Sequence, residues 1–329
     1  MTTKYYALST YLRQRFGERV QKIPLDGGMN CPNRDGTLSR HGCIFCNPSG
    51  SGTGQAAEGR TLAEQWDGWR DRFRRRYKAR RFLAYLQSFS NSYGPVHRFA
   101  GLLDQLRALP DVSGICIGTR PDCLEPAKLD LLGDLDLPEV WLDIGLQSSN
   151  DETLARINRG HDAATFAATV RAAAARGLKI CAHLIAGLPG ETETDFLETV
   201  RFVNELPVHG VKFHNLYVCH NTPLAEWFEA GRYVPPSRDD YCRWLAQGLA
   251  ALRQDIVIHR LNGDPAPGEL LAPNWAGAKQ TVRQAIHETL EASAVWQGCR
   301  WAPAPAPWFT ADAPLPPSLD LPGQEVTHV

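Results

Sequence analysis

Short apolar segments alternate with longer segments of helical spacing along most of this 329-residue chain. The apolar segments, which are rich in β-branched residues, span residues 20–25, 82–87, 114–117, 140–146, 178–186, 211–218 and 255–259. The segments of helical spacing span residues 62–77, 96–109, 125–132, 162–176, 194–206 and 241–253. Alternation at this repeat length is typical of βα units around a parallel sheet, whose strands are apolar because both faces are covered. About six such units follow the first strand, which predicts an α/β fold, an incomplete (β/α)6 barrel of the TIM type. A doubly wound open sheet is the alternative.

The two ends of the chain differ from this alternating part. We expect one core over residues 1–290, made of a cysteine-containing loop (26–54), the partial barrel (80–260) and a helical cap (265–295). Residues 302–323 contain seven prolines, a composition that buries too little surface to offset the entropy of ordering. The sequence therefore predicts an extended, flexible tail over residues 300–329. Its aromatic residues are the candidates for attaching part of it to the core: Trp301, Trp308 and Phe309.

The composition indicates a soluble protein with a large core, because 43% of the residues are hydrophobic and 22% are charged. No apolar run reaches the ~18 residues of a membrane span, and the N-terminus lacks the apolar segment of a signal peptide. We therefore expect a cytoplasmic protein without membrane contact, in a compartment that keeps thiols reduced. Nine cysteines in that compartment indicate metal ligation and buried thiols, not disulfides. The net charge of −1 carries no overall signature of nucleic-acid binding.

Three cysteines near the N-terminus, Cys31, Cys43 and Cys46, form a C-x11-C-x2-C pattern. A closed structural metal site normally takes four protein ligands, whereas three leave one coordination position for a substrate or cofactor. A [4Fe–4S] cluster held by three thiolates has one iron free for S-adenosylmethionine (SAM), which binds through its amino and carboxylate groups. Zinc is the alternative, with His41 completing a Cys3His site, but the single residue between His41 and Cys43 makes that geometry cramped.

A second feature is the density of basic residues on one predicted helix. Eight of the twelve residues from 70 to 81 are arginine or lysine. Apolar residues recur on the same helix at three- and four-residue steps and predict a buried stripe. The arginines then lie on the other faces; four of them are Arg72, Arg74, Arg75 and Arg76. They form either an ordinary solvated face or a surface that follows RNA phosphates.

The order of the motifs resembles the radical SAM enzymes, and within them the YhcC/YtqA-type proteins related to the catalytic subunit of Elongator. The resemblance covers about residues 15–290. Cys31, Cys43 and Cys46 match the superfamily's cluster ligands, with a first gap longer than the common C-x3-C-x2-C, as is typical of this branch. The resemblance implies a [4Fe–4S] cluster and SAM as cofactors, and an external one-electron donor of the flavodoxin or ferredoxin type.

The resemblance also implies contacts to SAM along the strand ends. Phe45 matches an aromatic residue near the adenine, and Phe213 lies in the strand beside the adenine. Gln147 ends a Gly-x-Gln-Ser strand whose polar end faces the ribose or methionine part of SAM. Arg159 matches an arginine that reaches the SAM carboxylate. His183 begins a segment whose backbone edge reads adenine.

Further polar residues are predicted to lie near the cofactor. Gln87 and Asn91 match the place where the family holds the SAM amino group. Arg120 directly follows an apolar segment, so we expect it to point into the cavity at the carboxyl ends of the strands. An ordinary loop residue is the alternative for Arg120 and Arg159, and a core histidine for His183. No nucleophile or acid–base pair is identified as catalytic.

The implied reaction is reductive cleavage of SAM to methionine and a 5′-deoxyadenosyl radical, which abstracts a hydrogen atom from the substrate. The Elongator-type relatives act on the C5 side chain of a wobble uridine in tRNA, so the resemblance suggests a similar change here, such as trimming a carboxymethylaminomethyl group. A radical SAM enzyme acting on a small metabolite or a protein is the first alternative. A zinc-stabilised RNA-binding module is the second.

Overall fold

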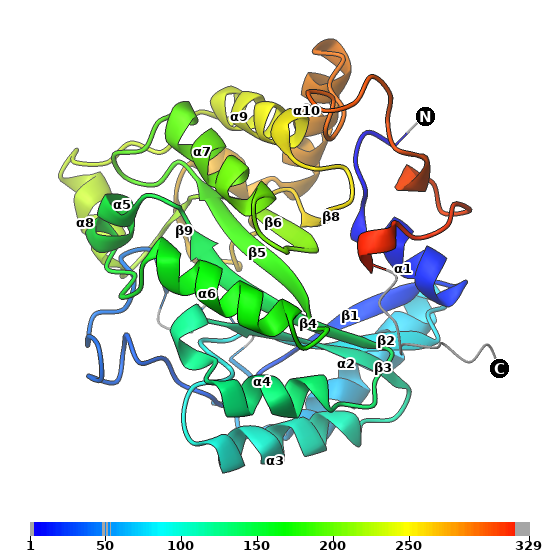
Figure 1. Cartoon of the computed structure of the whole chain (residues 1–329). Helices are drawn as coiled ribbons and strands as arrows, with labels where there is room; N and C mark the ends of the chain where they lie inside the picture. The colour runs from blue at the N-terminus through cyan, green and yellow to red at the C-terminus, as the bar shows by residue number, and fades with distance from the viewer. Residues whose placement is uncertain (1–2, 48–49, 51, 53, 320–329) are drawn as a thin grey trace.

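One parallel sheet organises the molecule. The computed structural model describes residues 3–47, 50, 52 and 54–319. The sheet runs in the order β1 (Val20–Leu25), β2 (Arg81–Leu86), β3 (Val112–Thr119), β4 (Glu139–Gln147), β5 (Lys179–Ala186), β6 (Gly210–Asn215) and β8 (Val257–Arg260). The spatial order of these seven strands is their order along the chain, so the sheet winds in one direction (Figure 1). A doubly wound sheet would reverse its strand order at a switch point. The predicted incomplete barrel is therefore confirmed, with residues 20–25 as its first strand.

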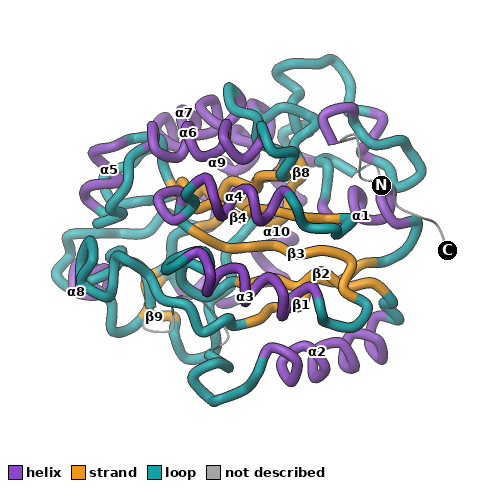
Figure 2. The backbone as a smooth tube through the Cα atoms, turned by 60° about the horizontal axis from the view of Figure 1, so that its bottom comes forward, coloured by secondary structure: helices purple, strands orange, loops and turns teal. Residues whose placement is uncertain are grey.

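Most of the helices cover the outer face of this curved sheet (Figure 2). The described α-helices are α1 (Leu8–Phe16), α2 (Leu62–Tyr77), α3 (Val96–Arg107), α4 (Pro126–Gly133), α5 (Asp151–Arg156), α6 (Ala163–Ala174), α7 (Glu193–Asn204), α8 (Pro223–Glu229), α9 (Arg238–Ala251) and α10 (Lys279–Ala292). Of the described helices, none has the length and apolar character needed to cross a membrane.

The expected strand over residues 211–218 is in fact two elements. β6 ends at Asn215, and the following β7 (Val218–Cys219) leaves the main sheet to pair antiparallel with β9 (Leu270–Ala272). The chain turns between them at Leu216 and Tyr217, and both residues line a cavity. Composition alone did not reveal this break, because Leu216 and Tyr217 in the turn and Val218 after it continue the apolar character of the segment.

The strands separate two kinds of side chain. In β4, Leu142, Ile144 and Leu146 point outward and join the core beneath the helices. Their neighbours Asp143 and Gln147 line a cavity on the inner side of the barrel. This alternation follows from the two-residue period of a strand.

The two ends of the chain fill the amino-terminal end of the barrel. Tyr6 and Tyr11, from the N-terminal segment and α1, pack there in a second core with Phe309 and Leu319 from the C-terminal segment. The ring of Tyr6 stacks on that of Phe309, with centroids 6.4 Å apart. Figure 1 shows the C-terminal residues, in red, beside α1.

The expectation of an extended, flexible tail needs correction for residues 300–319. Phe309 is 2% exposed and Leu319 is 1% exposed, so the proline-rich segment packs on the body through widely spaced apolar residues. Trp308 donates its indole N–H to the Gln254 carbonyl at 2.9 Å, as expected of an attaching residue. Trp301 remains 64% exposed. Residues 320–329 of the predicted tail lie outside the described residues.

Candidate active site

A cavity of about 660 Å³ opens at the carboxyl ends of the strands. The strand ends contribute Gln87, Gly118, Gln147, Ile185 and His214 to its lining. Two loops complete the wall, one contributing residues from 31–47 together with 50 and 52, and the other contributing residues from 264–269. The position agrees with the rule that barrels of parallel strands bind ligands at this end.

The loop between β1 and α2 brings the three predicted cysteine ligands to one wall of the cavity. The Cys46 N–H donates to the Cys43 carbonyl at 3.0 Å, so these two residues share a tight turn. The Ile44 N–H donates to the Ile157 carbonyl at 3.1 Å, which fixes the turn to the end of α5. Cys31 enters from the other end of the loop. Residues 48, 49, 51 and 53 of the predicted loop lie outside the described residues.

Nitrogen donors approach the sulfur of Cys43 from two sides. Asn33 donates from Nδ2 at 3.6 Å, and Arg159 donates from Nη1 at 3.5 Å. Burial, reinforced by the neighbouring Cys43, raises the pKa of the Cys46 thiol to about 11. Burial also raises the pKa of Cys31. Thiols in this setting become thiolates only beside strong positive charge, which the irons of a cluster supply.

The spacing of these sulfurs bears on the zinc alternative. Ligands of one tetrahedral zinc at about 2.3 Å lie roughly 4 Å from one another. Among the described residues, the three loop cysteines do not form a group with all ligand atoms within 4.8 Å of one another. At least one pair of these sulfurs is therefore farther apart than two ligands of a single zinc ion would be.

Arg159 is held beside the cysteine wall by the backbone of β4. Its Nη2 donates to the Gly145 carbonyl at 2.8 Å. A Cβ on Gly145 would lie 2.5 Å from that Nη2 and 2.6 Å from Nε2 of Gln147, so only glycine allows this close approach. The glycine of the Gly-x-Gln-Ser motif therefore makes room for the two side chains that were predicted to contact SAM.

The other predicted residues divide into two groups. Phe45, Gln87, Arg120 and His183 line the cavity together with Gln147 and Arg159. Arg120 is already engaged, because its Nε and Nη2 donate to Asp122 at 2.9 and 2.7 Å and its Nη1 donates to the Arg159 carbonyl at 2.7 Å. It therefore positions the Arg159 loop.

Asn91 and Phe213 do not line the cavity, so the structure does not bring them together with the other residues predicted to contact SAM. Asn91 is completely buried and donates from Nδ2 to the Gly118 carbonyl at 2.8 Å, which ties its loop to the end of β3. Phe213 packs edge-on against Phe196 under the helices, with centroids 5.9 Å apart. It occupies the outward position of β6, since the inward one belongs to His214.

Sequence reasoning missed a charged group inside the barrel, below the cavity mouth. Lys212 Nζ lies 2.5 Å from Asp143 Oδ2, and Lys22 Nζ lies 3.5 Å from the same oxygen. Lys212 also donates to the Tyr85 hydroxyl at 2.8 Å. Burial alone would raise the pKa of Asp143, but the ammonium groups of Lys212 and Lys22 hold it well below its usual range. The available signal was a single charged residue inside each of three apolar strands.

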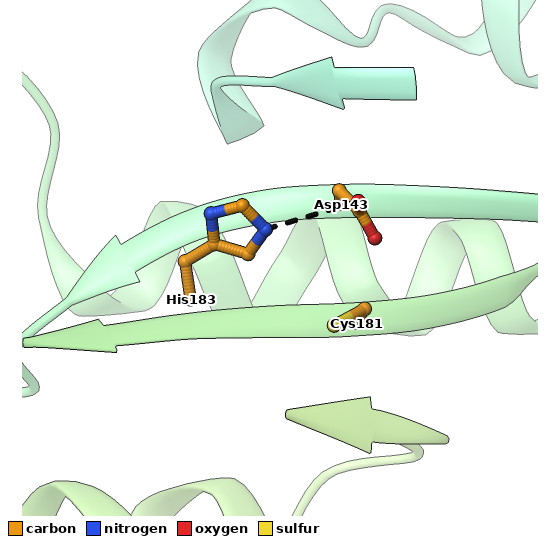
Figure 3. Close-up of side chains that lie close together, drawn as sticks. All are labelled: Asp143, Cys181 and His183. Carbon is orange, nitrogen blue, oxygen red and sulfur yellow. Dashed lines mark ion pairs between the residues drawn. The ribbon is translucent and has the colours of Figure 1, made fainter. Parts of the chain in front are cut away.

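Among the described residues, one set of three potential metal ligands has all its ligand atoms within 4.8 Å of one another. It consists of Asp143, Cys181 and His183 (Figure 3). His183 Nε2 points toward Asp143 Oδ2 at 4.0 Å. A metal ion does not suit this group, because Lys212 and Lys22 already approach the carboxylate and would repel a second cation. Burial also raises the pKa of the Cys181 thiol well above its ordinary value.

The basic helix α2 borders the cavity. Trp69 lines the cavity from this helix, and the Arg72 guanidinium lies 5.2 Å from the centroid of its ring. Arg75 and Arg76 are exposed beside it. Arg74 forms an ion pair with Asp111 at 2.8 Å.

Comparisons with known proteins agree with this geometry. The family described as the radical SAM superfamily matches residues 38–203, and the Radical_SAM C-terminal domain matches residues 208–292. The uncharacterised protein YtqA of Bacillus subtilis is 35% identical over 296 residues, which cover 90% of this chain and 92% of that protein. Protein YhcC of Escherichia coli K12 is 39% identical over 272 residues, which cover 82% of this chain and 87% of that protein.

Two more distant similarities are to a tRNA-modifying enzyme and to a solved structure. The tRNA uridine(34) acetyltransferase of Dehalococcoides mccartyi is 28% identical over 209 residues, which cover 61% of this chain and 44% of that protein. The solved structure of Methanocaldococcus infernus Elp3 has a TM-score of 0.63 at 14% identity, over 74% of this chain and 62% of that chain. At this identity the structural similarity concerns the fold alone.

Proposed function

This chain belongs to the radical SAM superfamily, and we propose that it modifies the C5 side chain of a wobble uridine in tRNA. Radical SAM proteins of this family are enzymes that use a [4Fe–4S] cluster and SAM, so the chain is an iron–sulfur enzyme of that kind. Membership decides against the zinc-stabilised RNA-binding module. An external one-electron donor is required, because the reductive cleavage of SAM consumes an electron.

Cys31, Cys43 and Cys46 are the residues that we propose hold the cluster. Two observations support this assignment: all three line one wall of the cavity, and N–H donors approach Cys43 in the manner of outer-shell partners that tune a metal site. When bound, the cluster and SAM supply a 5′-deoxyadenosyl radical that removes a hydrogen atom from an unactivated carbon.

The residues around the cysteine wall would orient SAM. Arg159 presents a guanidinium suited to the SAM carboxylate, and among the described residues its Nε is buried without a hydrogen-bond partner. Gln147 lines the cavity next to it. Burial, reinforced by Lys212, lowers the pKa of His183 well below its ordinary value, so this histidine offers hydrogen bonds without adding charge.

The observation that carries the choice of tRNA is the contact between the basic helix and the cavity. Trp69 of α2 lines the cavity and lies against Arg72. Arg75 and Arg76 extend the exposed positive surface along α2 toward the amino-terminal end of the barrel, where the neighbouring Tyr77 contacts Arg19. A nucleotide turned into the cavity would leave its neighbouring phosphates outside, and the RNA backbone would then follow these arginines along α2. The tRNA uridine(34) acetyltransferase among the relatives supports the same substrate class.

The direct test is nucleoside analysis of tRNA from a strain that lacks the gene. We expect an altered wobble-uridine side chain that returns to normal when the wild-type gene is restored. An unchanged wobble-uridine profile in the deletion strain would contradict the tRNA proposal and favour a small metabolite or a protein as the substrate.

Neutralising part of the basic helix tests the RNA surface separately. We expect the triple variant Arg72→Gln, Arg75→Gln, Arg76→Gln to weaken tRNA binding and to reduce the slope of log K against log salt by about 2–3, since each lost phosphate contact removes roughly 0.7–0.9. The matched control changes three exposed arginines on other helices, Arg13, Arg171 and Arg201, to glutamine. Equal salt slopes for the two triple variants would contradict a role of α2 in tRNA binding.

A further inference from the structure

The geometry points to a second subsite deeper in the cavity, centred on Arg260, that binds a negatively charged oxygen group of the substrate, a carboxylate or a phosphate. This inference rests on the proposed function and extends it, because it names the chemical class of the group that the substrate presents inside the barrel.

Arg260 lies at the end of β8 and reaches the cavity from its inner side. In the ladder between β6 and β8 it is the partner of Lys212. Its side chain lines the cavity with His183, His214 and Tyr217. The cysteine wall and Arg159 belong to other elements, the loop after β1 and the turn after α5. Arg260 is therefore a cation separate from the arginine expected to bind the SAM carboxylate.

No described residue compensates the charge of Arg260. Among the described residues it forms no ion pair, and its Nε is buried without a hydrogen-bond partner. The acidic residues that line the cavity are engaged elsewhere. Asp143 binds Lys212 and Lys22, and Asp264 pairs with Lys279. Glu269 lines the opposite loop and accepts from the neutral Asn47 Nδ2 at 2.7 Å, so it keeps its charge but forms no ion pair with Arg260. A buried polar group without a partner costs free energy, which a bound ligand can relieve.

The charges around this position do not balance. Lys22 and Lys212 face a single carboxylate, Asp143, and leave one excess positive charge; Arg260 adds a second. The histidines add none, because burial lowers the pKa of His214 to about 3 and that of His183 well below its ordinary value. The group formed by Lys22, Lys212, Asp143 and Arg260 therefore has an excess of positive charge, which favours an anionic ligand beside Arg260. A guanidinium matches the planar pair of oxygens of a carboxylate or the oxygens of a phosphate.

A nucleotide with a charged base side chain contains both kinds of anionic group, a carboxylate on the base and a phosphate in the backbone. A carboxylate at the end of the C5 side chain would place Arg260 next to the carbons on which the radical acts. A phosphate would place Arg260 next to the nucleotide backbone. The binding chemistry is the same, and the choice of probe separates the two.

The test measures binding to the full-length, cluster-loaded protein in the presence of SAM. The probes are 5-carboxymethylaminomethyluridine, its methyl ester, uridine and uridine 5′-monophosphate. We expect the wild-type protein to bind the acid roughly 10-fold more tightly than its methyl ester, or better. Arg260→Gln should bind the acid as weakly as wild type binds the ester, and its affinity for the ester should be unchanged. If a phosphate is the occupant, uridine 5′-monophosphate shows this dependence on Arg260 instead. Arg201→Gln, an exposed change on α7, should bind every probe like wild type.

Several outcomes separate the subsite from the proposed function. Wild-type affinities of Arg260→Gln for all probes would overturn the subsite and leave the tRNA proposal standing. If no uridine probe binds wild type, the tRNA proposal fails, and malonate and inorganic phosphate then test the subsite alone. These ions should raise the melting temperature of wild type but not of Arg260→Gln; equal shifts would overturn the inference. Arg260→Lys, which keeps the charge, and the iron content of each variant control for misfolding.

Discussion

Asp143 is fully buried in the barrel interior between two lysines, and its carboxylate offsets one of their two charges. We expect Asp143→Asn to lower the free energy of unfolding by roughly 3–5 kcal/mol, because it leaves buried ammonium groups without a counter-charge. Denaturant unfolding measures this loss. The double variant Asp143→Asn, Lys212→Met should recover part of it, since one of the stranded charges is removed. A loss below about 1 kcal/mol in the single variant would show that the lysines do not depend on this carboxylate.

Most of the residues predicted to lie near the cofactor line the cavity, whereas those whose position depends on strand phase or on local loop contacts do not. Gln147 ends β4 and Arg159 lies in the turn after α5, and both line the cavity. Phe213 was expected beside the cofactor, but the two-residue period of β6 turns it outward. The charged group formed by Lys22, Asp143 and Lys212 was missed because its members come from three strands far apart in the sequence, and only the fold brings them together.

At the scale of elements, periodic segments were predicted well and short ones were not. The helix over residues 62–77 has the predicted bounds, since Thr61 and Glu64 form a capping box and the apolar stripe defines the buried face. β7 has two residues and α5 has six, too few to establish a period. Such elements depend on tertiary contacts, which a single sequence does not display.

Glu191, in the turn between β5 and α7, gives this region a pH-dependent stability. Burial raises its pKa from 4.5 to about 7, while a hydrogen bond from Ser148 opposes that rise. A raised pKa in the folded state means that the contribution to stability is complete below pH 4.5 and is lost as pH rises through 7.

We therefore expect Glu191→Gln to change the free energy of unfolding, relative to wild type, more favourably at pH 8 than at pH 5. The difference between the two pH values is at most about 2–3 kcal/mol, because glutamine never ionises and still accepts from Ser148. Unfolding free energies of both proteins at the two pH values provide the measurement. If wild type and variant lose stability in parallel between pH 5 and pH 8, Glu191 is not the titrating group.

The whole molecule depends on its two ends to close the amino-terminal end of the barrel. Phe309 is 2% exposed in this second core and stacks on Tyr6. We expect Phe309→Ala to cost about 3–5 kcal/mol of unfolding free energy, and Phe309→Leu less than about 1.5 kcal/mol. Denaturant titration distinguishes them. A negligible loss in the alanine variant would mean that the proline-rich segment is not part of the folded body.

The global architecture was the most predictable level, and the closure of the barrel the least. Alternating segments determine a parallel sheet with sequential strands, because right-handed βα units leave few other arrangements. The C-terminal segment was expected to be extended, since proline content carries no information about where single anchors such as Phe309 and Leu319 will dock. Composition describes a segment on average, whereas docking depends on individual side chains.

The central claim is that three cysteines on one wall of the barrel mouth make this chain a generator of the 5′-deoxyadenosyl radical. The most direct measurement is the release of 5′-deoxyadenosine from SAM by anaerobically reconstituted protein with dithionite as reductant. We expect wild type and Cys299→Ala, a change outside the cavity lining, to bind about four irons per chain and to release the product. Cys31→Ala, Cys43→Ala and Cys46→Ala should each release less than about one hundredth as much, because each loses a thiolate ligand. Wild-type release by any of these three variants would contradict the assignment.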